Sequence, residues 1–307
     1  MSLLNTQRPA MDKRRRLRPS QISELVVINA DGTRREVIFE SCELFEAPNW
    51  TPDGRWLVVN ADGRLYKISP DGREGPIRIN TAPIEDLNND HVLSPNGRVV
   101  YLSSRDRHLY AAPFDGGAAK RLSPDQARER QYVYYLHGVS PDGQSLSFVG
   151  YEKSGTGDTI TRICTMPAAG GAIRELTDGR SFVDGPEYSS DGAWIYFNSE
   201  AAATQPGHAQ IFRMRADGST MQQITFDERV NWFPHFSPDG TKVAYLSFPA
   251  GTIGHPPDKN VLIRLMDPDG SHRRDLDGFL GGQGTMNVNS WSPDGERLAY
   301  VAYPIVG

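Results

Sequence analysis

Six short apolar runs, rich in β-branched and aromatic residues, are spaced along the chain between more polar segments. Each run has the length and composition of a strand that is buried in a sheet. No 3.6-residue periodicity of apolar positions is visible, so the pattern predicts strands rather than helices. The runs occupy residues 56–59, 99–102, 146–149, 194–197, 243–246 and 298–301.

A tetrapeptide close to Ser-Pro-Asp-Gly lies just before each apolar run. The glycine supplies a positive φ, the proline presets φ, and the Asp or Asn side chain caps the turn, so the tetrapeptide predicts a tight hairpin. The six copies begin 43 to 55 residues apart, a period typical of solenoids, propellers and arrays. They start at Thr51, Ser94, Ser140, Ser189, Ser237 and Ser292.

Each unit of the repeat contains a second hairpin, as at Asp217-Gly218, which brings the number of short strands per unit to four. Four strands in about 45 residues are typical of a β-propeller blade. Residues 23–40 hold only a second hairpin, and residues 289–303 hold only a first. The sequence therefore predicts an all-β, six-bladed β-propeller with four-stranded blades. Its ring is closed by N-terminal and C-terminal strands that share one blade.

Composition and charge add domain boundaries and exclude several classes of protein. Residues 1–22 are basic and lack an apolar signal segment, so we expect a flexible tail, one propeller domain at 23–307 and a cytoplasmic location. The net charge is −5 and no aromatic residues interleave with the basic run, which argues against a nucleic-acid partner. No apolar run approaches the roughly 18 residues of a membrane span. Cys42 and Cys164 lack the spacing of a disulfide framework or a thiolate metal site.

The topology of a propeller blade sorts the candidate site residues by face. The tetrapeptide turns share one face of the ring, and the blade-to-blade connections share the opposite face, next to the mouth of the central channel. Five of the seven histidines fall on that opposite face or at the mouth, where convergent polar groups predict a binding site. The candidate ligand-binding residues are Asp90, His91, His137, Asp184, Glu187, Asn231, Trp232, His235, Gln283 and Asn287.

Four of these candidates lie two or three residues before the serine of their own turn and could bind a divalent metal such as Zn²⁺ or Mn²⁺. They could equally bind an anionic ligand, act as general acid–base groups, or line the channel and be satisfied by water. On a regular strand, the side chains two and three residues before the serine point to opposite sides of the sheet. Either a bulge brings all four side chains to the same side, or only two of the four share the channel. The four residues are His91, His137, Glu187 and His235.

Each repeat unit consists of Trp/Phe-Ser-Pro-Asp-Gly, an apolar run, Ile-Phe/Tyr-x-Met-x-x-Asp-Gly and Leu/Ile-Thr. This unit resembles the WD40-like (PD40) repeat of the TolB C-terminal propeller. The resemblance covers residues 23–303 and includes the segments 184–189 and 231–235. It implies a stand-alone, TolB-like six-bladed propeller. TolB itself is periplasmic, has an added amino-terminal α/β domain, and binds protein partners in the Tol–Pal system. The sequence shows neither an export signal nor room for that domain, which argues against a Tol–Pal role.

A more distant resemblance is to the oligogalacturonate lyases, in which a propeller channel holds a metal with mainly His ligands. That likeness implies a metal role for the three histidines of the inner segments, with Glu187 as ligand or base and Asp184 orienting a ligand. Two functions therefore stay open. The one we favour is a non-catalytic module that binds an unknown protein, a peptide or a small acidic ligand at the mouth opposite the turns. The alternative is a metal-dependent lyase or hydrolase that acts on an acidic saccharide.

Basic residues bear on the choice between these two functions. Binding of a uronate ordinarily calls for Arg or Lys side chains at the mouth, since these pair with carboxylates. Arg229 is the only obvious basic candidate close to the site segments. That scarcity counts against the enzyme.

Overall fold

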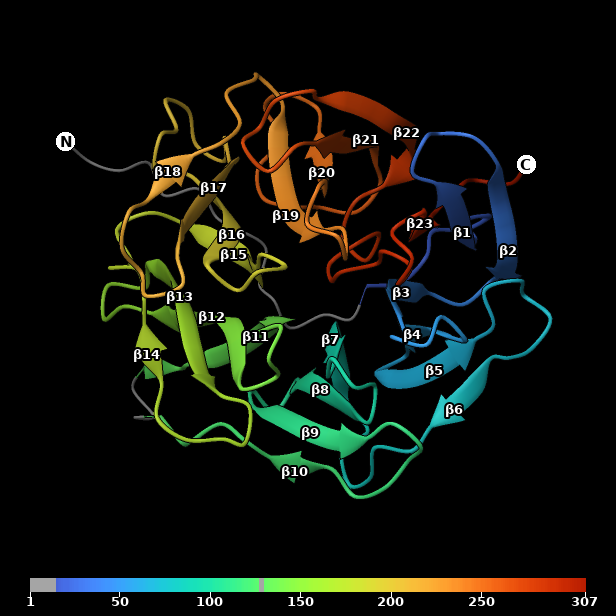
Figure 1. Cartoon of the computed structure of the whole chain (residues 1–307), viewed down its shortest axis with the longest axis horizontal. Coiled ribbons are helices and arrows are strands. Elements are labelled where there is room, and N and C mark those ends of the chain that lie inside the picture. The colour runs from blue at the N-terminus through green and yellow to red at the C-terminus, as the bar shows by residue number, and fades with distance from the viewer. Residues whose placement is uncertain (1–14, 127–129) are drawn as a thin grey trace.

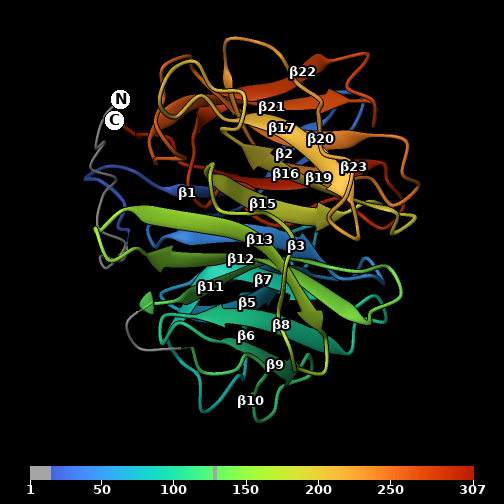
Figure 2. The same ribbon diagram turned by 90° about the vertical axis from the view of Figure 1, so that its left-hand side faces the viewer.

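The computed structural model describes residues 15–126 and 130–307, and the regular elements of that part of the chain are β-strands. Six sheets are arranged around a central axis (Figure 1). Figure 2 shows the ring from the side, where the sheets of neighbouring blades form successive twisted layers. The predicted all-β, six-bladed propeller is therefore confirmed.

The blades are numbered along the chain, and five of them contain four consecutive antiparallel strands. Blade 1 contains β3 (Phe45–Trp50), β4 (Leu57–Ala61), β5 (Arg64–Ile68) and β6 (Ile77–Ile79). Blade 2 contains β7 (Leu87–Leu93), β8 (Val99–Ser104), β9 (Leu109–Pro113) and β10 (Lys120–Arg121). Blade 3 contains β11 (Val133–Val139), β12 (Ser145–Lys153), β13 (Thr159–Pro167) and β14 (Arg174–Glu175). Blade 4 contains β15 (Val183–Tyr188), β16 (Trp194–Ser199), β17 (Gln210–Arg215) and β18 (Gln222–Gln223). Blade 5 contains β19 (Val230–Phe236), β20 (Val243–Phe248), β21 (Lys259–Met266) and β22 (Arg274–Gly281). The closing blade contains β23 (Arg297–Ala302), β1 (Ser23–Asn29) and β2 (Arg35–Ser41).

The two ends of the chain pair in the closing blade, as the sequence predicts. β1 lies antiparallel to β23, with Leu25 opposite Val301. The innermost position of this blade differs from the others, because it holds a single bridge between Trp291 and Leu298 in place of a longer strand. The chain just before Trp291 divides its hydrogen bonds: Ser290 and Thr285 carbonyls accept from Ala299 and Val301 of β23, whereas other residues of the segment bond to other blades.

The tetrapeptide turns are stabilised by their own side chains. In the fifth copy, the Ser237 hydroxyl donates to Asp239 Oδ1 at 2.6 Å and accepts from the Lys242 N–H at 2.9 Å. The Gly240 N–H donates to the Ser237 carbonyl at 2.9 Å. The serine or threonine hydroxyl donates to the Asp or Asn side chain in all six copies. The repeated residues are therefore those that the turn itself requires.

The six turns also contact one another around the ring. A Cβ built on Gly97 would lie 3.3 Å from Cδ of Pro52 in the preceding turn. The same proline–glycine contact joins Gly143 to Pro95, Gly192 to Pro141, Gly295 to Pro238 and Gly54 to Pro293. Where Ser190 replaces the proline, its hydroxyl donates to the carbonyl oxygen of Ser237 at 2.9 Å. The turns thus form a second closed ring, independent of the β1–β23 ladder.

Part of the predicted tail lies against the propeller. Residues 1–14 are outside the described part of the chain, whereas residues 15–22 run along the face opposite the turns. Gln21 forms a bridge with Ile305 and its side-chain amide donates to the carbonyl oxygen of Tyr303 at 2.9 Å. The amino-terminal segment therefore reaches the same face as the predicted site.

The turn ring predicts the effect of one glycine substitution. Gly97 has a φ of 68° and contacts Pro52, so Gly97→Ala should destabilise the protein by about 1–2 kcal/mol. Gly155→Ala is the matched control, because Gly155 has a negative φ and no atom within 4 Å of a built Cβ. Urea unfolding should show a lower midpoint for the first variant and an unchanged or slightly higher midpoint for the second. Equal midpoints for both variants would show that the turn contact contributes nothing.

Candidate functional site at the channel mouth

Residues 282–290, here called the plug segment, lie in the middle of the ring and contact the closing blade and blades 1, 3, 4 and 5. The Gly284 carbonyl accepts from the N–H of Ala47 in β3 at 2.7 Å. The Asn287 carbonyl faces His137 Nδ1 in β11 at 3.2 Å, and the Met286 carbonyl faces His235 Nε2 in β19 at 3.3 Å. The red chain before β23 is visible at the centre of Figure 1. The plug segment therefore joins inner strands from different sides of the ring.

The inner strands contain β-bulges, which change the direction of side chains that lie two or three residues before the turn serine. The register of each inner strand from β3 to β19 shifts just before its turn. In β3, β15 and β19 the residue four positions before the turn serine or threonine has a positive φ: Ala47 at 53°, Gly185 at 62° and Phe233 at 53°. Bulges re-aim side chains locally. His91, His137, Glu187 and His235 are all buried although their offsets differ, and of these four Glu187 and His235 pair with each other.

Glu187 and His235 form a buried pair that links blades 4 and 5. His235 Nδ1 lies 2.6 Å from Glu187 Oε2, and its Nε2 faces the plug segment. The other carboxylate oxygen of Glu187 accepts from the Phe236 N–H at 2.9 Å and from Asn289 Nδ2 at 2.6 Å. Removing one member of such a pair leaves a buried polar group without compensation. These contacts indicate that the pair holds the ring together.

His91 lies apart from the other two inner histidines. Its Nε2 faces the Val58 carbonyl in β4 at 3.3 Å, and its side chain is buried between blades 1 and 2. Burial lowers the pKa of His91 to about 4, so its ring is neutral near pH 7. The structure does not bring it together with His137 and His235.

His137 and Asp184 form an ion pair at the mouth, between β11 and β15. His137 Nε2 lies 3.0 Å from Asp184 Oδ1, and the imidazole stacks on Phe233 with ring centroids 5.6 Å apart. Burial disfavours the charged ring, but the hydrogen bond to Asp184 and the charges of Asp90 and Asp184 outweigh it and raise the pKa of His137 to about 9. His255 Nε2 approaches the second oxygen of Asp184 at 3.8 Å. The imidazolium is the stable form here.

Two further carboxyl groups lie beside this pair. Asp90 is buried; its Oδ2 accepts from Asn88 Nδ2 at 2.8 Å, whereas its Oδ1 has no hydrogen-bond partner among the described residues. Burial raises the pKa of Asp90 to about 6, with the charge of Asp184 adding to the effect. Burial also raises the pKa of Glu46 to about 7, against the charges of Arg15 and Arg105. Carboxyl groups from blades 1, 2 and 4 thus meet at the mouth.

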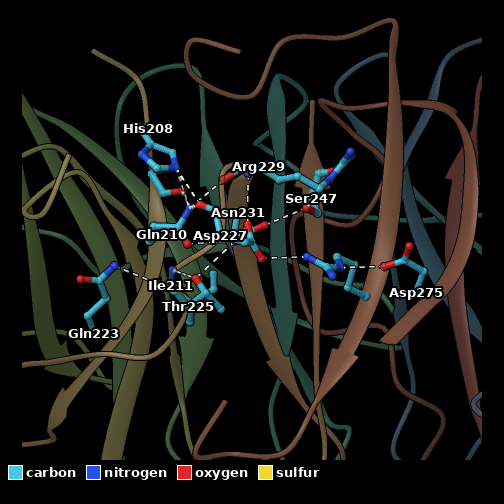
Figure 3. Close-up of polar contacts among 12 residues, drawn as sticks. His208, Gln210, Ile211, Gln223, Thr225, Asp227, Arg229, Asn231, Ser247 and Asp275 are labelled. Atoms are coloured by element: carbon cyan, nitrogen blue, oxygen red, sulfur yellow. Dashed lines mark hydrogen bonds and ion pairs between the residues drawn. The ribbon is translucent and has the colours of Figure 1, made fainter. Parts of the chain in front are cut away.

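Asn231, a predicted ligand-binding residue, belongs instead to a polar network within and between blades 4 and 5 (Figure 3). Its side-chain amide donates to Gln210 Oε1 at 3.2 Å and to Asp227 Oδ1 at 3.1 Å, and its Oδ1 accepts from Ser247. Arg229 donates to the side chain and carbonyl of Ser247 at 2.9 and 2.8 Å. The basic residue that the sequence suggested for a carboxylate ligand is half-buried and engaged by Ser247.

The aromatic candidate Trp232 is fully buried and packs between Phe182 and His255, with centroid distances of 5.9 and 4.5 Å. It serves packing at the mouth more than stacking of a ligand. Gln283 and Asn287 belong to the plug segment, where the carbonyl of Asn287 engages His137. The candidate residues that lie about a common region are Asp90, His137, Asp184 and Asn287, because Asp90 interacts with the side chains of the other three.

Sequence reasoning missed Glu46, Asp258 and the aromatic ring of Tyr303. A signal for Glu46 was present, because Glu46 and Asp184 both lie five residues before the first residue of their own turn. Asp258 lies in the β20–β21 loop, outside any repeated position, with a φ of 60°. Tyr303 follows the last strand and is fully buried beside the plug segment.

The arrangement does not fit the predicted metal site. His137 and His235 each present both ring nitrogens to protein oxygen atoms, and His91 lies apart. Across residues 15–126 and 130–307, no group of three or more His, Cys, Asp or Glu side chains has the geometry to hold a metal ion. The same described residues include no helix long and apolar enough to cross a membrane.

This geometry predicts that metal ions do not stabilise the protein. Added Mn²⁺ or Zn²⁺ should leave the thermal midpoint of the purified, untagged protein unchanged, because only a ligand that binds the native state raises stability. A rise that disappears in His137→Ala and His235→Ala would instead show a site at these histidines. Differential scanning calorimetry makes the comparison.

The His137–Asp184 pair predicts a pH-dependent stability. A histidine whose folded pKa is raised stabilises the protein fully below its unfolded pKa of 6.5, and this contribution is lost as the pH rises through about 9. The shift corresponds to roughly 3 kcal/mol. The difference in unfolding free energy between wild type and His137→Gln should therefore be larger at about pH 6 than at about pH 10. An equal difference at both pH values would show that the charge of His137 does not stabilise the fold.

Comparison with known proteins agrees with this architecture. The family described as the TolB beta propeller domain (PD40) matches residues 138–255. An uncharacterized protein of Agrobacterium fabrum is 39% identical over 288 residues, which cover 92% of this chain and 93% of that protein. A solved structure from Agrobacterium tumefaciens whose name refers to TolB has a TM-score of 0.84 and 38% identity, and the match covers 93% of this chain and 99% of that one.

More distant matches limit what can be transferred. A TolB homolog of Chlorobium luteolum is 30% identical over 154 residues, which are 48% of this chain but 31% of that protein. The structure of an oligogalacturonate lyase in complex with manganese has a TM-score of 0.53 and 15% identity over 84% of this chain and 67% of that one, a likeness of fold alone. The long matches at high identity decide the family. The chain belongs to the TolB-like β-propeller family, whose PD40 repeats it carries.

Proposed function

We propose that this protein is a non-catalytic binding module that takes up a segment of a partner protein at the mouth opposite the tetrapeptide turns. The observation that carries the proposal is Asp90. Its carboxyl group is buried at the mouth on a rigid inner strand, and Oδ1 has no hydrogen-bond partner among the described residues. Buried polar atoms are rarely left unpaired without a functional or structural reason.

The tetrapeptide turns that the structure describes on the opposite face hold no buried, unpaired carboxyl oxygen. The Asp and Asn side chains of the tetrapeptide turns are engaged by the hydroxyl of their own turn and by backbone N–H groups. These side chains already use their hydrogen-bonding groups to stabilise the hairpins. The mouth is therefore the better candidate for recognition.

Charge at the mouth favours a cationic partner over the acidic ligand that the sequence suggested. Carboxyl groups of Glu46, Asp90 and Asp184 lie there, and the imidazolium of His137 already pairs with Asp184. An added carboxylate would meet like charges, whereas a Lys or Arg side chain would pair with them.

The lyase or hydrolase alternative loses support from the same contacts. It requires His91, His137 and His235 to share one metal ion, but these side chains have different protein partners and do not converge. Resemblance to the manganese-containing lyase extends to the fold, which does not fix a function. Binding without catalysis therefore remains the better-supported function.

Site-specific photo-crosslinking tests the proposal. A photoreactive amino acid at Ala250, exposed on the β20–β21 loop at the mouth face, should form a defined protein adduct in an extract of the native host. The matched control places it at Thr241, which is exposed on the turn face. Asp90→Asn should weaken the adduct at position 250 several-fold while the protein keeps its thermal midpoint. An adduct that forms equally at both positions, or none at position 250, would contradict the proposal.

A further inference from the structure

We infer that the mouth contains a guanidinium-binding cradle, formed by Tyr303, Asp258 and Gln283, which Arg15 of the same chain occupies and which can take an arginine of a partner segment. The inference rests on the proposed function and gives the chemistry of the group that the mouth recognises. It requires that the cradle belong to the ring and that its present occupant be replaceable.

The contacts of Arg15 are those of specific guanidinium recognition. Its Cζ lies 3.8 Å from the centroid of the Tyr303 ring, a cation–π distance. One terminal nitrogen donates to the carbonyl oxygen of Gln283, and the other lies 3.6 Å from Asp258 Oδ1. The Arg15 side chain is 11% exposed, so the long side chain is inserted rather than spread over the surface.

The walls of the cradle are fixed by the ring itself. Tyr303 follows β23, is fully buried, and donates its hydroxyl to the Phe45 carbonyl in β3 at 2.8 Å. Gln283 belongs to the plug segment, and Asp258 ends the β20–β21 loop. Each wall has a contact that does not involve residues 15–18, since Gln21 donates to Asp258 Oδ1 at 2.8 Å and the Gln283 N–H donates to the Pro256 carbonyl at 3.3 Å. The cradle is therefore preorganised for a guanidinium.

The fit of Arg15 leaves room for a better ligand. Its Nη2 is buried but has no hydrogen-bond partner within the described residues, since its contact with Asp258 is too long for a hydrogen bond. The carboxyl group of Glu46 lies beside Tyr303, because a Cβ built on Gly284 would meet both Glu46 Oε1 at 2.5 Å and Tyr303 Oη at 2.6 Å. A second carboxylate is therefore within reach of a guanidinium that enters slightly differently.

The spacing of the two bound arginines in residues 15–18 indicates which partner sequence the mouth would recognise. Arg18 Nε pairs with Asp258 Oδ2 at 2.8 Å, while the intervening Arg16 is exposed and Leu17 packs against the core of the closing blade and blade 1. The recognised chemistry is therefore an Arg-x-x-Arg segment with an apolar residue before the second arginine. Lysine is a poor substitute, since it lacks the planar face that stacks on tyrosine and the fork that binds two acceptors.

Binding of a free peptide to the full-length protein tests the inference. The probe is a peptide with the sequence of residues 12–20, titrated into Arg15→Gln and into Arg16→Gln, the matched control that removes an exposed arginine. A tethered Arg15 competes at an effective concentration in the millimolar range, so Arg15→Gln should bind the peptide at least about tenfold more tightly than wild type or Arg16→Gln. Isothermal titration calorimetry measures the difference.

Two further variants keep the result interpretable. Adding Asp258→Asn to Arg15→Gln should abolish the gain, and replacing the first cradle arginine of the peptide by lysine should weaken binding about tenfold. Arg15→Lys, which keeps the positive charge, provides a second route if Arg15→Gln unfolds, and it should also bind the arginine peptide better than wild type. Equal binding by the Arg15 and Arg16 variants, or equal binding of the arginine and lysine peptides, would overturn the inference.

These outcomes are separate from those of the proposed function. Failure of the peptide to bind folded Arg15→Gln, together with an intact adduct at position 250, would remove the cradle and leave the mouth as a binding site. Peptide binding to Arg15→Gln without any adduct at position 250 would keep the cradle and remove the protein partner.

Discussion

Closure of the ring is the constraint on which every feature of the mouth depends. The β1–β23 ladder joins the two ends of the chain, and the contacts between neighbouring tetrapeptide turns close the ring a second time on the opposite face. The mouth residues come from inner strands of different blades, so no pair of blades alone could assemble them. The same closure brings Arg15 and Tyr303 together at the mouth. Fold and candidate site are thus consequences of one geometric condition.

The plug segment explains how a polar centre is tolerated. Backbone carbonyls of Gly284, Met286 and Asn287 face groups on blades 1, 5 and 3, so polar side chains that point inward find partners within the protein. The Glu187–His235 pair links blades 4 and 5, and loss of either partner would leave a buried polar group unpaired. Nearer the mouth, Asp184 is paired with His137, whereas Asp90 Oδ1 has no hydrogen-bond partner among the described residues.

The sequence predicts the fold well because every repeated residue has a local task. Serine, proline, Asp and Gly each serve the turn or its contact with the next turn, as the Ser190 variant shows by replacing a proline contact with a hydrogen bond. Strand order and the shared closing blade follow from counting these units. The single bridge at Trp291 could not be foreseen from the repeat, because the residues before it bond both to β23 and to other blades.

The sequence predicts the candidate site less completely than the fold, because the local backbone and the neighbours of single residues decide where their side chains point. Offsets from the turn indicate which residues lie near the channel, but the positive φ of Phe233 and Gly185 decides where the neighbouring side chains point. Arg229 and Asn231 resemble ligand residues in the sequence, yet neighbouring polar groups engage both. Asp258 and Tyr303 lie outside the repeat, and only the folded ring brings them to Arg15.

We infer that the closed ring forms a mouth that binds a guanidinium group. Nuclear magnetic resonance of the arginine side chains tests this inference most directly. In protein labelled with ¹⁵N at arginine, the Nε–Hε signal of Arg15, assigned through Arg15→Lys, should be shifted upfield by the Tyr303 ring and exchange slowly with water. An Arg15 signal at the ordinary exposed position, exchanging as fast as that of Arg16, would contradict a cradle at the mouth.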